Sequence, residues 1–209
     1  MFKKALLPDT FRAIQLVSGY MDIKSAYLAG GTALALQLGH RISVDLDFFT
    51  KETFDEKVLS KALEKNPEFV LETLEWRTIL GKIGETKFSI FYYKYDVIDV
   101  YEKYEGINIL GLKDIAAMKI HAIEERGSKR DFIDVYFLSK HFSMKEMLSF
   151  YEQKYKSLDD HLYSISKALG YFEAADTQDL PQMLVPLKWD KVKEYFEKES
   201  LNLVRENFS

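Results

Sequence analysis

The chain has 209 residues and a formal net charge of −4, with 47% hydrophobic and 30% charged residues, an ordinary composition for one large or two small globular domains. It contains no cysteine, which excludes disulfides, thiolate nucleophiles and zinc–sulfur sites, and we expect a cytoplasmic protein. The charge argues against a general nucleic-acid coat, and no stretch approaches the ~20 apolar residues of a membrane span.

Hydrophobic periodicity predicts that helices and strands alternate over the first 111 residues. We expect a helix at 9–20, a strand at 26–29, a helix at 32–39, a strand at 43–49, a helix at 53–65, β-rich runs over 68–83 and 85–98, and a short strand at 107–110.

From Leu112 onward the pattern is helical, and Ser143 and Glu146 have the spacing of a capping box. The expected helices are 112–126, 130–140, 143–155, 160–172 and about 189–205. We therefore predict an α+β fold: a small mixed or antiparallel sheet domain flanked by helices in residues 1–111, followed by a helical region in residues 112–209.

A glycine pair and a pair of aspartates suggest a phosphate and metal site. Gly30 and Gly31 are expected to form a turn before a helix that starts near Thr32, where open backbone N–H groups and the helix dipole favour phosphate. Side chains alternate along a strand, so Asp45 and Asp47 are expected on one face, where a cation would relieve their repulsion. Either feature alone is more often an ordinary turn or a solvated strand end. Together they indicate a pocket for a metal–nucleoside triphosphate.

A second group of charged residues lies downstream. Lys119 and Arg126 are seven residues apart and fall on nearly one line of a helix, and Asp131 and Asp134 are neighbours on the next helix, which Arg130 starts. The alternative interpretation is a solvated charged face, with Asp131 favoured by the helix dipole.

The pattern GGTAL(x)6RxSxDxD in residues 30–47 resembles the first motif of the AbiEii/AbiGii toxin family of nucleotidyltransferases, within the DNA polymerase β-like nucleotidyltransferase superfamily. A downstream K(x)6R motif and an RDxxD-like segment are also similar, and the resemblance covers about residues 25–140. The matching positions are Gly30, Gly31, Thr32, Arg41, Ser43, Asp45, Asp47, Lys119, Arg126, Arg130, Asp131 and Asp134.

The resemblance implies a nucleotidyltransferase domain in residues 1–111 that transfers NMP from an NTP to an RNA acceptor, with transfer RNA as one candidate, or to a protein. It also implies a toxin with a cognate antitoxin. Asp45 and Asp47 would hold Mg²⁺ or Mn²⁺, and Asp131 or Asp134 would orient or deprotonate the acceptor or position the basic residues. The implied catalytic residues are Asp45, Asp47, Lys119, Asp131 and Asp134, and the implied nucleotide-binding residues are Gly30, Gly31, Thr32, Arg41, Ser43, Lys119, Arg126 and Arg130.

The superfamily usually has a third carboxylate on a strand after the paired aspartates, and Ser89 stands near that place. Three alternatives follow: one metal assisted by Asp131 or Asp134, a third ligand from another acid, or a nucleotide-binding or regulatory module without efficient transfer. A DNA-binding helical domain is disfavoured because residues 141–209 contain no concentrated basic patch.

Overall fold

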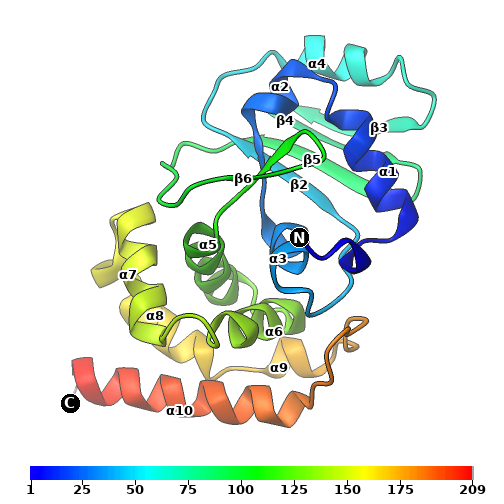
Figure 1. Cartoon of the computed structure of the whole chain (residues 1–209). Coiled ribbons are helices and arrows are strands. Elements are labelled where there is room, and N and C mark those ends of the chain that lie inside the picture. The colour runs from blue at the N-terminus through cyan, green and yellow to red at the C-terminus, as the bar shows by residue number, and fades with distance from the viewer. Residues whose placement is uncertain (209) are drawn as a thin grey trace. The chain divides into compact units, whose positions relative to one another are not determined.

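The structure of the protein is a computed structural model that describes residues 1–208 (Figure 1). The chain forms two compact units, unit 1 (Met1–Gly111) and unit 2, which starts at Leu112. Across residues 1–208, no helix is both long enough and apolar enough to pass through a bilayer.

Unit 1 is built on a mixed β-sheet. In the described chain the sheet has seven strands in the order β3-β4-β5-β2-β1-β7-β6. The pairs β2–β5 and β1–β7 are parallel and the other neighbours are antiparallel. This confirms the predicted α+β class with a mixed sheet. The strands are β1 (Tyr27–Leu28), β2 (Leu46–Thr50), β3 (Phe69–Glu75), β4 (Thr78–Ile83), β5 (Thr86–Tyr92), β6 (Glu102–Tyr104) and β7 (Ile107–Ile109).

Helices pack against this sheet: α1 contacts β5, α2 contacts β7, α3 contacts β2, and α4 contacts β3 and β4. Alternation along the central strands buries Leu46 and Phe48 of β2 and Phe88 and Ile90 of β5, and the rings of Phe48 and Phe88 are 5.9 Å apart. The helices of unit 1 are η1 (Lys3–Ala5), α1 (Pro8–Val17), α2 (Met21–Ser25), α3 (Gly30–Leu38) and α4 (Glu56–Leu63).

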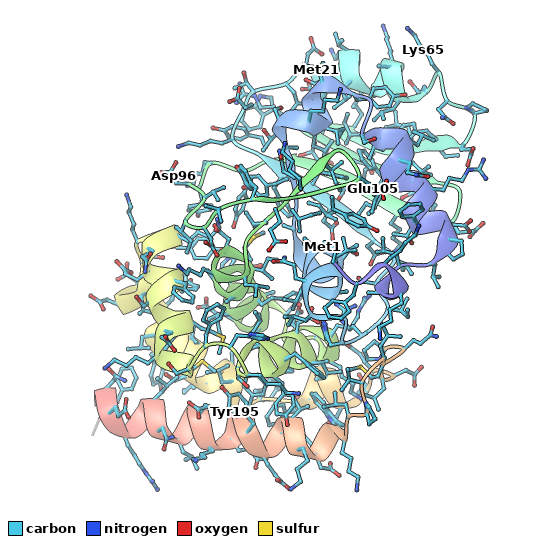
Figure 2. All side chains as sticks on the ribbon, in the orientation of Figure 1. Met1, Met21, Lys65, Asp96, Glu105 and Tyr195 are labelled. Carbon is cyan, nitrogen blue, oxygen red and sulfur yellow. The ribbon has the colours of Figure 1, made fainter. Side chains whose placement is uncertain are left out.

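Three short elements of unit 1 are absent from the sequence prediction. The 3-10 helix η1 and the edge strand β6 have only three residues each, and the short helix α2 begins at Met21, which is labelled in Figure 2. None is long enough to show a helical or alternating period. The expected helix 9–20 is also too long, because α1 ends at Val17 and the chain turns through Ser18 into α2.

Unit 2 is helical, as predicted. The helix α5 packs on α6, α7 and α8, and α10 packs on α8 and α6. The capping box at Ser143 and Glu146 is confirmed at the start of α7. The short helix α9 was not expected. The helices are α5 (Leu112–Glu125), α6 (Lys129–Leu138), α7 (Met144–Tyr155), α8 (Leu158–Leu169), α9 (Glu173–Asp176) and α10 (Trp189–Phe208).

Candidate functional site: a glycine turn beside paired aspartates, and a buried lysine–aspartate cluster

The two glycines form the first turn of α3, rather than a turn before the helix as the sequence suggested. Gly30 has φ +64°, a backbone conformation that favours glycine, and a Cβ placed on it would lie 3.3 Å from Oδ2 of Asp47. A Cβ on Gly31 would lie 2.3 Å from Nη2 of Arg41. The glycines therefore let Asp47 and Arg41 approach the backbone at the start of α3.

Thr32 holds the chain that leads into β2. Its hydroxyl donates to the carbonyl oxygen of Asp45 and lies 2.9 Å from Oγ of Ser43. Thr32, Arg41 and Ser43 are all buried. The contacts of Thr32 with Ser43 and Asp45 hold this segment against the first turn of α3, so buried side chains position the site from within the fold.

The predicted strand 43–49 begins only at Leu46, so Asp45 lies ahead of the β-ladder. Strand alternation therefore accounts for Asp47, which lies within β2 and alternates with the buried Leu46 and Phe48, but it does not by itself place Asp45. Asp45 is placed instead by the hydrogen bond from Thr32 to its carbonyl oxygen.

Ser89 lies beside Asp47 in the parallel pair β2–β5. The Ser89 hydroxyl donates to Oδ1 of Asp47 at 2.6 Å, and Ser89 is buried. The β5 residue next to Asp47 is thus a hydroxyl donor, Ser89, instead of an acid. Among the described residues, no three His, Asp or Glu side chains form a group that could hold a metal ion.

The donor chemistry at this place nevertheless suits a hard divalent cation. Asp47 turns Oδ1 toward the Ser89 hydroxyl and Oδ2 toward Gly30. The carboxylates of Asp45 and Asp47 are only partly buried. Magnesium is often held by one or two carboxylates plus the phosphates of its substrate, so a pair of oxygen donors is a sufficient protein share of such a site.

Aromatic rings follow Asp47 and Ser89 along the same two strands. Phe49 and Phe91 are paired in register, with ring centroids 5.4 Å apart, and the ring of Tyr93 is 5.2 Å from that of Phe49. Tyr95 continues this group at 5.0 Å from Tyr93. All four rings are half-buried. They form one packed group that follows Asp47 in β2 and Ser89 in β5.

In unit 2, the predicted charged residues form a buried cluster. Nζ of Lys119 is 2.9 Å from Oδ1 of Asp131 and 2.6 Å from Oδ2 of Asp134, and all three side chains are almost inaccessible. Arg126, which follows α5 and is 64% exposed, makes a bidentate contact with Asp131 at 2.8 and 3.0 Å. Arg130 is exposed on α6.

Ser128 is a member of this cluster that the sequence reasoning missed. It is the N-cap of α6, and its hydroxyl lies 2.5 Å from Oδ2 of Asp131. Its signal in the sequence is a serine three residues before an acid, the spacing of a capping box. The capping geometry fixes Asp131 in the first turn of α6, facing Lys119 and Arg126.

Asp131 is an ionised carboxylate in this environment. Burial alone would raise the pKa of Asp131, but Lys119, Arg126 and the Ser128 hydroxyl outweigh it and hold that pKa well below the ordinary value of 3.8. A carboxylate held this firmly is a weak proton acceptor near neutral pH. The geometry thus favours the interpretation in which Asp131 positions the basic residues.

Two further polar groups of unit 2, one buried and one partly exposed, were not expected from the sequence. Nζ of Lys154 on α7 is 2.7 Å from Oδ1 of Asp114 on α5, and both side chains are completely buried. Glu124 on α5 contacts Nδ1 of His161 at 2.7 Å and accepts from the Ser164 hydroxyl on α8. Both groups tie α5 to its neighbours.

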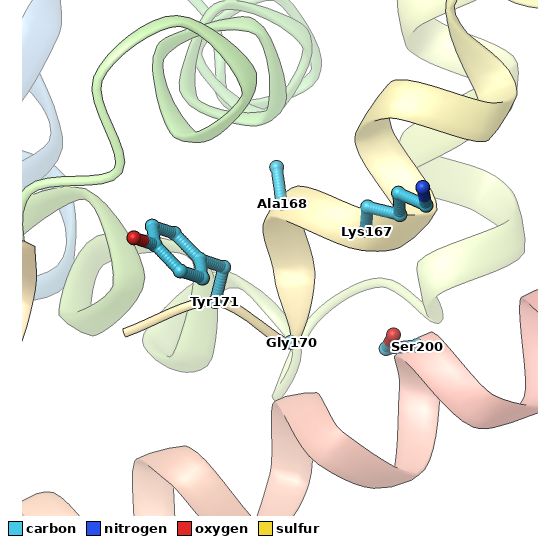
Figure 3. Close-up of a pocket in the computed structure, with 5 residues that line it drawn as sticks. All are labelled: Lys167, Ala168, Gly170, Tyr171 and Ser200. Carbon is cyan, nitrogen blue, oxygen red and sulfur yellow. The ribbon is translucent and has the colours of Figure 1, made fainter. Parts of the chain in front are cut away.

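An open hollow of 580 Å³ lies between the end of α8 and α10, and it contains none of the predicted site residues (Figure 3). It is lined by Lys167, Ala168, Gly170, Tyr171 and Ser200. Ser200 donates to the carbonyl oxygen of Ser166, so its hydroxyl serves the contact between the two helices.

The fold of this chain is similar to that of solved structures, among them the following two. JHP933 from Helicobacter pylori has a TM-score of 0.52 and 17% identity, covering 98% of this chain and 91% of its own. MenT4, a nucleotidyltransferase toxin from Mycobacterium tuberculosis H37Rv, has a TM-score of 0.54 and 13% identity, covering 94% of this chain and 82% of its own.

The sequence comparisons are more specific. The family model described as "Nucleotidyl transferase AbiEii toxin, Type IV TA system" matches residues 22–199, and the chain belongs to this family. An uncharacterized protein from Aquifex aeolicus (strain VF5) is 39% identical over 184 residues, covering 83% of this chain and 85% of the relative. The family expected from the motifs is thereby confirmed.

Proposed function

We propose that the protein transfers NMP from an NTP to an acceptor in a reaction that depends on Mg²⁺ or Mn²⁺, and that it is the toxin of a toxin–antitoxin pair. One observation supports this most: the Asp47 carboxylate lies between the Ser89 hydroxyl and the backbone of Gly30 at the start of α3. The carboxylate that we propose as a metal ligand therefore lies beside a helix N-terminus that favours phosphate.

In unit 1, Asp45 and Asp47 would hold the divalent cation, and the backbone of Gly30 and Gly31 would receive the phosphates. The bound cation would supply positive charge to the triphosphate during transfer. Buried Thr32, Arg41 and Ser43 would keep the turn and Asp45 in place. These three residues act on the nucleotide through the geometry of the turn.

In unit 2, Lys119, Arg126 and Arg130 would supply cationic charge for the nucleotide phosphates. Asp131 and Asp134 would hold Lys119, and Asp131 would also hold Arg126. The depressed pKa of Asp131 supports this positioning role over a role as general base. Attack of an acceptor hydroxyl on the α-phosphorus forms a new P–O bond and breaks the bond to the β-phosphate oxygen, releasing pyrophosphate.

The acceptor is proposed to be RNA, with transfer RNA as a candidate, or a protein, and a cognate antitoxin is the expected partner. Ser89 favours a second candidate function, a nucleotide-binding or regulatory module without efficient transfer. The reason is that Ser89 supplies a neutral donor beside Asp47, at a strand position where the superfamily usually has a third acid.

Labelled NTPs, Mg²⁺ and total RNA or cell protein test the transferase directly. We expect label on an acceptor with wild type and with Asp9→Asn, an exposed control in unit 1, and no label with Asp47→Asn. Mg²⁺ plus NTP should also raise the melting temperature of wild type more than that of Asp47→Asn. NTP binding without transfer to any acceptor would support the regulatory module.

A further inference from the structure

A second hollow in unit 2 is lined by lysines from two distant parts of the chain. It has a volume of 480 Å³ and lies between the end of α6 and the segment that enters α10. Its lining residues are Tyr136, Lys140, Pro186, Leu187, Lys188 and Lys191. Because Lys140 and Lys188 are separated by 48 positions, no local run of basic residues reveals this site in the sequence.

The lysines give the hollow a positive charge, and most of this charge has no carboxylate partner in the described part of the chain. All three are exposed, and only Lys191 has a carboxylate partner, Glu194 at 2.7 Å, within residues 1–208. Unit 2 as a whole carries 17 Asp and Glu against 15 Lys and Arg, so the hollow is a local basic site on an acidic unit. An anionic ligand is therefore expected here.

An aromatic ring adjoins these charges. Tyr136 is half-buried, with Nζ of Lys140 5.6 Å from its ring centroid, and the ring of Tyr195 on α10 packs edge-on at 5.7 Å (Tyr195 is labelled in Figure 2). Pro186 and Leu187 supply apolar surface beside it. Cationic groups together with an aromatic face are the means by which proteins bind single-stranded nucleic acid, through phosphates and stacked bases.

We propose that this hollow binds a single-stranded segment of RNA, with phosphates on Lys140, Lys188 and Lys191 and a base against Tyr136. The inference rests on the proposed function in one respect, since it selects RNA from the two acceptor classes. Binding itself requires neither a metal ion nor an NTP at the aspartate pair.

The test is fluorescence anisotropy of a 5′-labelled single-stranded RNA with the full chain, without Mg²⁺ or NTP, over a series of salt concentrations. Lys140→Ala/Lys188→Ala should weaken binding and reduce the slope of log K against log[salt] by about 1.4, the value for two lost phosphate contacts. Tyr136→Leu should weaken binding by about tenfold and leave the slope unchanged. The charge-matched control Lys145→Ala/Lys156→Ala, at the two ends of α7, should bind as wild type does.

The proposal would be overturned if the wild type did not bind RNA, or if the two double variants bound RNA with equal affinity. Displacement of the RNA by poly-glutamate as effectively as by unlabelled RNA would also overturn it, in favour of an acidic protein ligand. Asp47→Asn should keep full RNA affinity. If the protein bound RNA through these lysines but transferred no NMP, the proposed function would therefore be rejected and this binding site would stand.

Discussion

Ser89 donates a 2.6 Å hydrogen bond to Oδ1 of Asp47, although the two residues are 42 positions apart in the chain. The bond is possible because β2 and β5 run parallel with these residues in register. It leaves Oδ2 of Asp47 directed toward Gly30, at the first turn of α3. The orientation of the proposed metal ligand is thus set by a hydroxyl on the neighbouring strand.

Ser89→Ala should therefore weaken the binding of Mg²⁺–NTP. A hydrogen bond to a charged group contributes about 1.5–3 kcal/mol, which corresponds to a loss of roughly tenfold or more in affinity. Calorimetric titration with a non-hydrolysable NTP measures it, and Ser25→Ala, which removes an exposed hydroxyl in α2, is the control. Unchanged affinity in Ser89→Ala would show that Asp47 needs no support from β5.

Gly31→Ala should destabilise the start of α3. The added Cβ would clash with the Arg41 guanidinium, which is buried. Overpacking of this kind costs about 1–3 kcal/mol. Gly19→Ala is the matched control, because the nearest atom to its Cβ, the Leu16 carbonyl oxygen, is at an ordinary 3.9 Å. Thermal unfolding should separate the two variants, and equal melting temperatures would contradict the close approach of Arg41.

Asp131→Asn should lower stability in a pH-dependent way. The pKa of Asp131 is below its ordinary value in the folded protein, so ionised Asp131 stabilises the fold above about pH 5, and this contribution is lost as the pH falls toward the folded pKa. Near neutral pH the loss should be about 3–5 kcal/mol, the usual cost of breaking a buried ion pair. Urea unfolding of both proteins from pH 7 to pH 3 measures the difference. A gap that does not narrow in acid would show that Asp131 is not the titrating group.

Asp114→Asn should destabilise unit 2 by a similar amount, about 3–5 kcal/mol, because it leaves the fully buried Lys154 ammonium without its carboxylate. The double variant Asp114→Leu/Lys154→Met should regain most of that stability, since apolar groups of similar volume often replace a buried ion pair at little cost. Chemical denaturation of the wild type, the single variant and the double variant tests this. A double variant no more stable than the single would mean that the pair is needed for the packing of α5 on α7.

The sequence was informative where a residue's role depends on local pattern. The apolar periods indicated most of the helices, and the capping box placed the start of α7 at Ser143. Four of the charged residues singled out in unit 2, Lys119, Arg126, Asp131 and Asp134, lie together in the structure, because they come from consecutive helical segments. Closeness in the sequence also associated Gly30 with Asp47, which lies beside it in the structure.

The sequence was less informative where burial or distant pairing decides the outcome. Nothing local shows that Lys119 and Thr32 are buried, or that Asp45 lies outside the strand of Asp47. The Asp114–Lys154 pair joins residues 40 positions apart, and a buried ion pair has the same residue types as a solvated one. Such relationships follow from tertiary packing, which single-sequence patterns do not specify.

The parallel pairing of β2 with β5 also bears on when the protein becomes able to act. In the sequence, α4, β3 and β4 lie between these two strands. The contacts of the β3–β4 hairpin join residues that are near in sequence, so forming the hairpin costs little chain entropy. The Asp47–Ser89 contact depends on a longer closure, so we expect it among the late steps of folding. Pulse-labelled hydrogen exchange should show amides of the β3–β4 hairpin protected before those of β2. A nascent or partly folded chain would then carry its glycine turn before it forms the contact between Asp47 and Ser89.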